Sequence, residues 1–393
     1  MVPSSIFFVA DRFSLIFGVN RKLFFSLLLI PLALLDIRFS VSGMIVRVSD
    51  LYLLGIFAVF WLFERSFWSY AVYKLSAFLP FFLYVSAVLL LGDSFNGFKQ
   101  VIQWGLVLMW PVCLSYCLRP SDENFLKVFR FFLLVCATIV VFMHWRQGYF
   151  VGYKHLGDMK YAFGLFFVVS AIGVKCFHGM KSWSYLAVAT ILLIASLERK
   201  GIVVGSLAVV LFWCLTRSVA VRRAFPLVAS LCMIGCIFSA VFVYEIAVEN
   251  VAIYTYGLDE SEAAWHSNLH RMNLLGNGVE IFYAHPWFGV GADQLKYKMV
   301  NFYFNTGLAL YTHNWYLDFL VEYGLLGVLL FFGVPLLLLR KIKLIDSFDC
   351  VCAVLATYCF VVPVFMANGT TSMLIWLTSL GLFLCLALKS RLA

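Results

Sequence analysis

Apolar segments of about twenty residues recur along the whole chain, and short polar stretches separate them. A helix of roughly twenty residues spans the ~30 Å hydrocarbon core of a bilayer. Hydropathy therefore predicts an all-α, polytopic integral membrane protein with about twelve transmembrane helices. Their expected centres are Leu28, Phe57, Phe82, Leu108, Leu134, Phe167, Ile191, Val209, Met233, Leu330, Ala356 and Phe383.

One long hydrophilic segment, residues 248–312, interrupts this pattern. A connection of this length in a compact protein is usually functional. Apolar positions recur at helical spacing from 268 to 285, and the Pro- and Gly-containing stretch 286–293 predicts a turn. The chain is thus expected to divide into nine spans (1–247), a loop region with helices of its own (248–312) and three further spans (313–393).

The composition excludes a soluble class and several kinds of site. The 393 residues are 63% hydrophobic and only 12% charged, whereas soluble domains carry about 25% charged residues. The net charge of +9 is loop charge, and no Gly-rich phosphate loop or basic–aromatic stretch predicts nucleic acid as a partner. The eleven cysteines lie in apolar segments as small hydrophobes. No metal-binding pattern is present, so we expect no metal and no cofactor.

Short basic loops predict the orientation, because Lys and Arg accumulate on the cytoplasmic side. With twelve spans, four basic clusters fall on one face: Arg21 and Lys22; Arg217, Arg222 and Arg223; Arg340, Lys341 and Lys343; Lys389 and Arg391. Both termini are therefore expected in the cytoplasm. The long segment 248–312 then lies on the outer face.

Arg199 and Lys200 lie between two apolar segments that are joined by almost no loop. This places both cations where the spans reach the outer face of the membrane. One interpretation is a pair of cations that extend toward the interface. The other is an anion site, because the charge rule disfavours cations on this face.

Arg271 follows His270 in the stretch SNLHRMN of the long segment. The guanidinium presents a planar fork of donors that matches phosphate. A solvated surface arginine is the alternative interpretation.

His313 and Asn314 stand at the start of an apolar segment, where Thr312 is expected to cap the helix and the other two to occupy its first turn. The positive end of the helix dipole favours an anion and a neutral imidazole, and a neutral imidazole can act as a base. A histidine at the membrane interface is the alternative.

Gly324 and Gly327 lie eleven and fourteen residues after His313. Small residues at such positions let a neighbouring helix approach closely. We therefore expect another helix to pack against this part of the span.

These residues resemble the O-antigen ligase family of the lipopolysaccharide pathway. The family signature is His, then Asn, Ser or Gln, nine residues, Gly, two residues, and Gly, Thr or Tyr. It is matched by His313, Asn314, Gly324 and Gly327. An arginine-led helix before P-x-x-G-x-G is matched by Arg271, Pro286, Gly289 and Gly291.

The family's Ser-Arg pair is matched less closely, by Ser196 and Arg199. The spacing departs by two residues, which leaves open whether Arg199 or Lys200 takes the family role; we favour Arg199.

The resemblance implies a metal-independent glycosyltransferase in the bacterial inner membrane with a periplasmic active site. A glycan on undecaprenyl pyrophosphate would move to a sugar hydroxyl of lipid A–core. The catalytic residues implied are His313, Arg271 and Arg199, and those implied to bind substrate are Lys200, Asn314 and His270. Both partners are lipids.

Two other functions stay open from the sequence. An O-antigen polymerase would carry Arg-x10-Gly patterns in outer loops, and one occurs from Arg146 to Gly157. A lipid-linked glycan transporter would need charged groups along a path at the midplane, whereas the notable charges here gather on one face.

Overall fold

The structure is a computed structural model of the chain. It describes residues 65–90, 95–117, 160–177, 179–195, 199–244, 267–300, 311–366 and 370–392, with short pieces at 38–41 and 44–47 and within 51–58 and 126–142. The segment 143–159, which contains the Arg146–Gly157 pattern, lies outside these residues.

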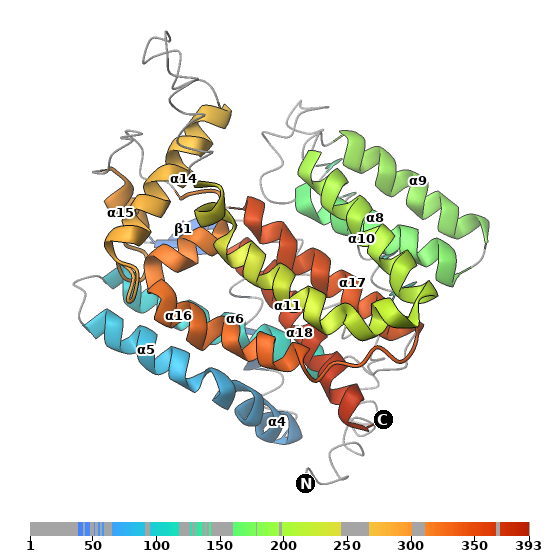
Figure 1. The fold of residues 1–393 in the computed structure, drawn as a ribbon, viewed down its shortest axis with the longest axis horizontal. Coiled ribbons are helices and arrows are strands. Elements are labelled where there is room, and N and C mark those ends of the chain that lie inside the picture. Colours follow the sequence, from blue (N-terminus) through green and yellow to red (C-terminus); the bar gives the residue numbers. More distant parts are fainter. Residues whose placement is uncertain are drawn as a thin grey trace.

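Helices dominate the described part of the chain (Figure 1). They are α4 (Arg65–Leu75), α5 (Leu79–Leu90), α6 (Phe95–Cys117), α8 (Lys160–Cys176), α9 (Met180–Ala195), α10 (Arg199–Arg217), α11 (Val219–Phe242), α14 (Ser267–Ala284), α15 (Leu295–Val300), α16 (Trp315–Leu339), α17 (Ser347–Val361) and α18 (Thr370–Leu392), with 3-10 turns η2 (Ser76–Phe78) and η5 (Val362–Phe365).

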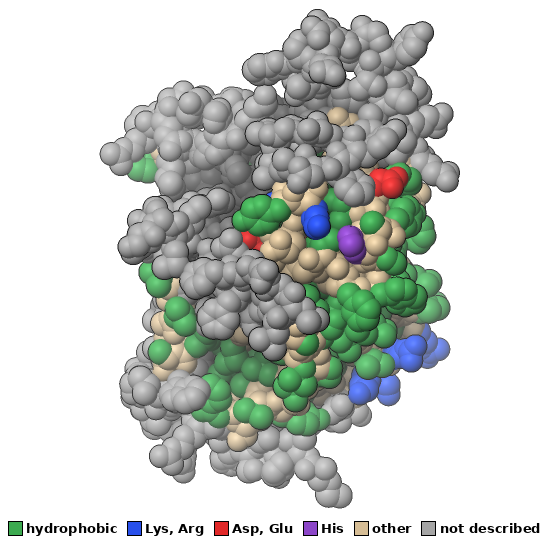
Figure 2. Space-filling view, turned by 90° about the vertical axis from the view of Figure 1, so that its left-hand side faces the viewer, with side chains coloured by type: hydrophobic (Ala, Val, Ile, Leu, Met, Phe, Trp, Pro, Cys, Tyr) green, Lys and Arg blue, Asp and Glu red, His purple; other side chains and the backbone are tan. Residues whose placement is uncertain are grey.

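Five of the described helical segments are long and apolar enough to cross a membrane: Phe67–Val88, Lys200–Arg217, Val219–Phe242, Trp315–Leu339 and Ser347–Phe365. Each contains one predicted centre. Apolar side chains cover much of the described part of the face shown in Figure 2. On α10 and α11, the apolar residues Leu207, Val210, Leu227 and Leu231 are all more than half exposed. Such a surface is stable in lipid rather than in water, which supports a membrane protein.

A two-stranded hairpin departs from the all-α expectation. β1 (Arg38–Val41) pairs antiparallel with β2 (Met44–Arg47), with Arg38 opposite Arg47. The stretch lies between the first two predicted spans, and its β-branched and aromatic residues favour extended backbone.

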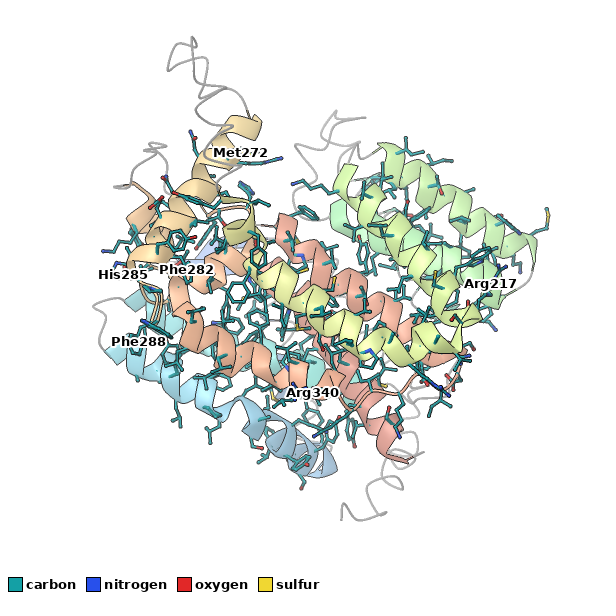
Figure 3. The ribbon with its side chains drawn as sticks, viewed as in Figure 1. Arg217, Met272, Phe282, His285, Phe288 and Arg340 are labelled. Carbon is teal, nitrogen blue, oxygen red and sulfur yellow. The ribbon has the colours of Figure 1, made fainter. Side chains whose placement is uncertain are left out.

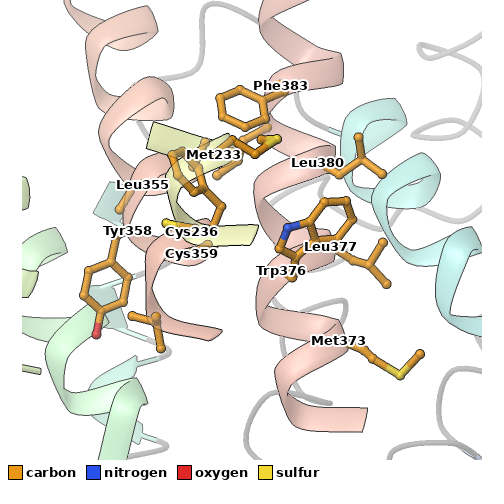
Figure 4. Packing of buried hydrophobic residues seen from close by; sticks show 14 of the residues in the cluster. Met233, Cys236, Leu355, Tyr358, Cys359, Met373, Trp376, Leu377, Leu380 and Phe383 are labelled. Carbon is orange, nitrogen blue, oxygen red and sulfur yellow. The ribbon is translucent and has the colours of Figure 1, made fainter. Parts of the chain in front are cut away.

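α16 lies at the centre of the helices that form the site, with α5, α11, α14 and α18 packed against it. An aromatic core fixes it: the ring of Phe331 lies 4.8 Å from that of Phe81 and 4.9 Å from that of Trp376. Figure 4 shows Trp376 and Leu380 of α18 beside residues of α11 and α17. The rigid core sets the direction of α16 and therefore the position of its first turn.

Basic residues gather at the opposite end of this bundle. The Arg222 Nη1 donates to the carbonyl of Ile345 at 3.2 Å, and the amide of Lys343 donates to Ser390 Oγ at 2.8 Å. These bonds join the start of α11 and the end of α18 to the connection between α16 and α17. Figure 3 likewise shows Arg217 and Arg340 far from His285. Three predicted basic clusters therefore lie at one end of the bundle, and the side of the membrane that this end faces stays a prediction.

Candidate functional site

The turn before α16 differs from the expected one. Asn314, not Thr312, caps the helix: its Oδ1 accepts from the amides of Tyr316 and Leu317 at 3.1 and 3.2 Å. Its Nδ2 donates to Ser239 Oγ of α11 at 3.1 Å. The expectation that His313 and Asn314 occupy the first turn was wrong, because an asparagine side chain satisfies the free helix amides better than a threonine.

Asp318 holds the preceding residue in place. Its Oδ1 accepts from the Thr312 amide at 2.8 Å and from the Thr312 hydroxyl at 2.7 Å. The carboxylate is fully buried, and hydrogen bonds to a charged group are stronger than neutral ones. The turn is therefore tied to the helix on both sides of position 313.

His313 itself is exposed, between buried Thr312 and buried Asn314. Its φ is +58°, a left-handed conformation that costs an ordinary residue about 1–2 kcal/mol. Such a conformation persists only where the surroundings impose it, and it is frequent at functional sites. The anchored neighbours thus force the imidazole outward from the start of α16.

A loop–helix bracket, formed by residues 286–291 and 321–326, lies behind this turn. α16 is interrupted at Gly324, where φ is 64° and ψ is −173°. Four backbone bonds cross to the loop: Val290 N to Val321 O at 2.9 Å, Gly291 N to Glu322 O at 3.0 Å, Leu325 N to Pro286 O at 2.8 Å and Leu326 N to Trp287 O at 3.1 Å. They satisfy amides and carbonyls that the interruption frees.

The bracket explains why the two halves of the sequence signature carry glycine. A Cβ on Gly324 would lie 2.4 Å from the Trp287 carbonyl oxygen, and one on Gly289 would lie 2.5 Å from that of Glu322. Both glycines also have positive φ, 64° and 70°. Side chains at these positions are excluded by contact and by backbone conformation.

The sequence predicted that a helix would pack against Gly324 and Gly327, and the structure bears this out at Gly327 only. At Gly327 a Cβ would lie 3.2 Å from Tyr84 of α5, so a helix does approach there. At Gly324 the neighbour is the loop 286–289. The Tyr84 hydroxyl lies 2.8 Å from the Phe288 carbonyl and 2.7 Å from that of Tyr323, and so closes the bracket.

The bracket predicts a large effect of one methyl group. Gly324→Ala should destabilise the protein by on the order of 2 kcal/mol or more, because positive φ and a backbone clash add. Gly333→Ala in the same helix is the matched control, since nothing lies within 4 Å of its Cβ. Thermal unfolding in detergent measures both, and equal midpoints would contradict the bracket.

A polar cluster that the sequence did not predict adjoins the turn. The Tyr311 hydroxyl donates to Asp293 Oδ1 at 3.0 Å, and Lys296 Nζ lies 2.6 Å from Asp293 Oδ2. Burial, with the nearby carboxylates of Glu322 and Asp293, raises the pKa of Tyr311 well above its usual value. The pKa of Lys296 is raised overall, because the attraction of Asp293 for the charged ammonium outweighs the opposite effect of burial. At neutral pH the phenol is therefore protonated and the ammonium charged.

Arg271 lies on the side of α14 that faces the turn. A Cβ on Gly278 would lie 2.5 Å from Thr312 Cγ2 and 2.8 Å from Leu317 Cδ2, so α14 and the turn are in direct contact. Arg271 precedes Gly278 by seven residues, which puts it on the same helix face about 10 Å further along. Its side chain is half-buried, and it extends from the face that contacts the His313 turn.

The remaining predicted site residues are Arg199, Lys200, His270 and Asn314. Arg199 is the first residue of α10; its side chain and that of His270 lie outside the described residues. Lys200 Nζ lies 5.0 Å from the centre of the Phe365 ring in η5, and η5 packs against α16 and α11. The structure thus joins the helix of Arg271 to the turn of His313 directly, and the helix of Lys200 through η5 and α11. Asn314 is buried as the helix cap, and its contact with substrate stays a prediction.

Among the residues that the structure describes, no group of three or more His, Cys, Asp or Glu side chains could hold a metal ion.

Residues 184–332 match the family model described as O-antigen ligase. The matched range begins in α9 and ends within α16, so it contains α14, the bracket and His313. No curated protein matches the chain. The resemblance predicted from the sequence is confirmed over this range.

Proposed function

We propose that this chain, whose residues 184–332 match the O-antigen ligase family, transfers a glycan from undecaprenyl pyrophosphate to a sugar hydroxyl of lipid A–core. The family match supports the ligase and polymerase superfamily and partners that are lipid-linked glycans. We assign the reaction to the outer face of the bacterial inner membrane, and propose a chain of about twelve spans.

The observation that carries this proposal is the strained, outward position of His313 on a doubly anchored turn. The buried Asp318 and the Asn314 cap hold this turn in place, and α14, the helix of Arg271, packs directly against it. Pre-organised groups stabilise a transition state without the cost of rearranging at the moment of reaction.

The proposed mechanism divides the work between the two kinds of side chain. The imidazole of His313 accepts the proton of the acceptor hydroxyl as its oxygen bonds to the anomeric carbon. The bond from that carbon to the pyrophosphate oxygen breaks at the same time, and undecaprenyl pyrophosphate leaves. Arg271 and Arg199 bind the pyrophosphate, whose negative charge grows during this step.

Complementation of a ligase-deficient strain tests the function. The ligase proposal expects long glycan on lipid A–core when the chain is expressed. Lengthening of the lipid-linked glycan without its transfer would instead identify a polymerase, and flipping without either product a transporter.

The identity of the second cation can be tested separately. We expect Arg199→Ala to abolish transfer and Lys200→Ala to reduce it only weakly, because Lys200 lies over the Phe365 ring and a cation there contributes through that contact. Glycan transfer in membranes, normalised to protein amount, measures both. An inactive Lys200→Ala with an active Arg199→Ala would reverse the assignment.

The orientation can be tested by labelling introduced cysteines. In a background without reactive native thiols, a cysteine at Glu260 should react with an impermeant reagent in intact spheroplasts. A cysteine at Lys341, which is exposed at the basic end, should react only after lysis. The reverse pattern would invert the proposed topology.

A further inference from the structure

A cavity opens at the basic end of the bundle, between the start of α11 and the connection from α16 to α17. Its volume is about 500 Å³, and its lining residues are Val219, Arg222, Arg223, Ile342, Lys343, Leu344 and Ile345. α16 separates this end from His313 by 25 residues, about 37 Å of helix. The cavity is therefore distinct from the candidate active site.

The polar part of the lining is cationic. Three of the lining residues carry positive charge, and none of the described lining residues is acidic. The nearby carboxylates of Asp346 and Asp349 accept hydrogen bonds from backbone amides at the start of α17. Asp349 Oδ2 accepts from the amides of Ile345 and Asp346 at 2.7 and 3.1 Å. They cap the helix reciprocally.

The Arg222 guanidinium is fixed at the cavity. Nη1 donates to the Ile345 carbonyl at 3.2 Å, while Nε is buried and has no hydrogen-bond partner. A buried donor without a partner costs free energy, but the buried Nε does not face the open cavity, so a ligand would use the other donors of the guanidinium. Arginine favours phosphate because its donors form a planar fork.

The remaining lining is apolar and borders the lipid-facing surface. Val219 is 53% exposed and Ile345 47% exposed, although both are hydrophobic. A cationic pocket with an apolar rim between transmembrane helices matches an anionic headgroup with its attached acyl chains.

We propose that this cavity binds a phosphate-bearing anion through Arg222, Arg223 and Lys343. Two sources share this chemistry, the headgroup of an anionic phospholipid and free inorganic phosphate. The apolar rim favours the phospholipid, which would hold α11, α17 and α18 together at this end.

The test uses the purified full chain in detergent and two probes, phosphatidylglycerol and inorganic phosphate, with phosphatidylcholine as the uncharged reference. Binding is followed by native mass spectrometry for the lipids and by the thermal unfolding midpoint for phosphate. Arg223→Gln and Lys343→Gln should each weaken binding roughly fivefold, the contribution of one cation near an anionic lipid. Arg222→Gln should weaken it at least as much.

Lys341→Gln and Arg340→Gln are the matched controls, because both residues are exposed in the same connection and neither lines the cavity. Controls at the wild-type level with weakened lining variants would support the site, and the probe that shows this identifies the source. Equal losses in lining and control variants, or no preference over phosphatidylcholine and no effect of phosphate, would overturn it. If Arg222→Gln fails to fold, the other two lining variants decide.

Discussion

Arg271→Ala is expected to abolish glycan transfer while the protein still folds and inserts. A donor aimed at growing negative charge typically contributes about 10²–10³ in rate. Arg271→Lys should rescue poorly, because an ammonium does not reproduce the bidentate geometry of the guanidinium. The activity is measured as transfer from a purified lipid-linked glycan to lipid A–core. The unfolding temperature shows whether each variant is still folded.

Lys298→Ala is the matched control for this experiment. Lys298 is an exposed cation of the neighbouring α15, so its loss changes the charge of the region without removing a residue of the proposed site. An equal loss of activity in Arg271→Ala and Lys298→Ala would show that the positive charge of the region matters and not a specific contact of Arg271. Full activity of Arg271→Lys would contradict bidentate binding.

The helices were predictable because hydropathy reports the lipid that surrounds them. Predicted centres at Phe82, Val209, Met233, Leu330 and Ala356 all fall in helices of membrane-spanning length. The hairpin of β1 and β2 was missed because a short apolar stretch has no periodicity that separates strand from helix.

The bracket could not be predicted, although its glycines could be named. A glycine in a sequence shows that contact or positive φ is possible, but not which segment approaches. The partner of Gly324 is the carbonyl of Trp287, 37 residues earlier in the sequence. Only the folded chain brings these atoms together.

The candidate site was predictable to a similar extent. The residue types of Arg271 and His313 indicated anion binding and proton transfer, and α14 does pack against the His313 turn. The cluster of Tyr311, Asp293 and Lys296 was missed because its hydrogen bonds join segments on either side of residues 301–310. The one local signal was Asp293, two residues after the end of the P-x-x-G-x-G stretch, with Lys296 three residues further on.

The backbone at His313 sharpens a test of its role. His313→Ala should lower turnover by about 10²–10⁴-fold if the imidazole is a general base. Alanine keeps the strain of positive φ, so His313→Gly is the control that removes the imidazole and the strain together. Equal losses in both variants would assign the effect to the imidazole, whereas an active glycine variant would assign it to the backbone.

His313→Gln separates proton transfer from positioning. Glutamine can donate a hydrogen bond to pyrophosphate, but it cannot accept a proton at neutral pH. If His313 is the base, the glutamine variant should be nearly as slow as His313→Ala. Wild-type turnover should also fall at acidic pH, because a protonated imidazole cannot accept another proton. His285→Gln, at an exposed residue directly after α14, should behave as wild type. Near-normal turnover by His313→Gln in the purified assay would rule out the base role and leave His313 as a donor that positions the pyrophosphate.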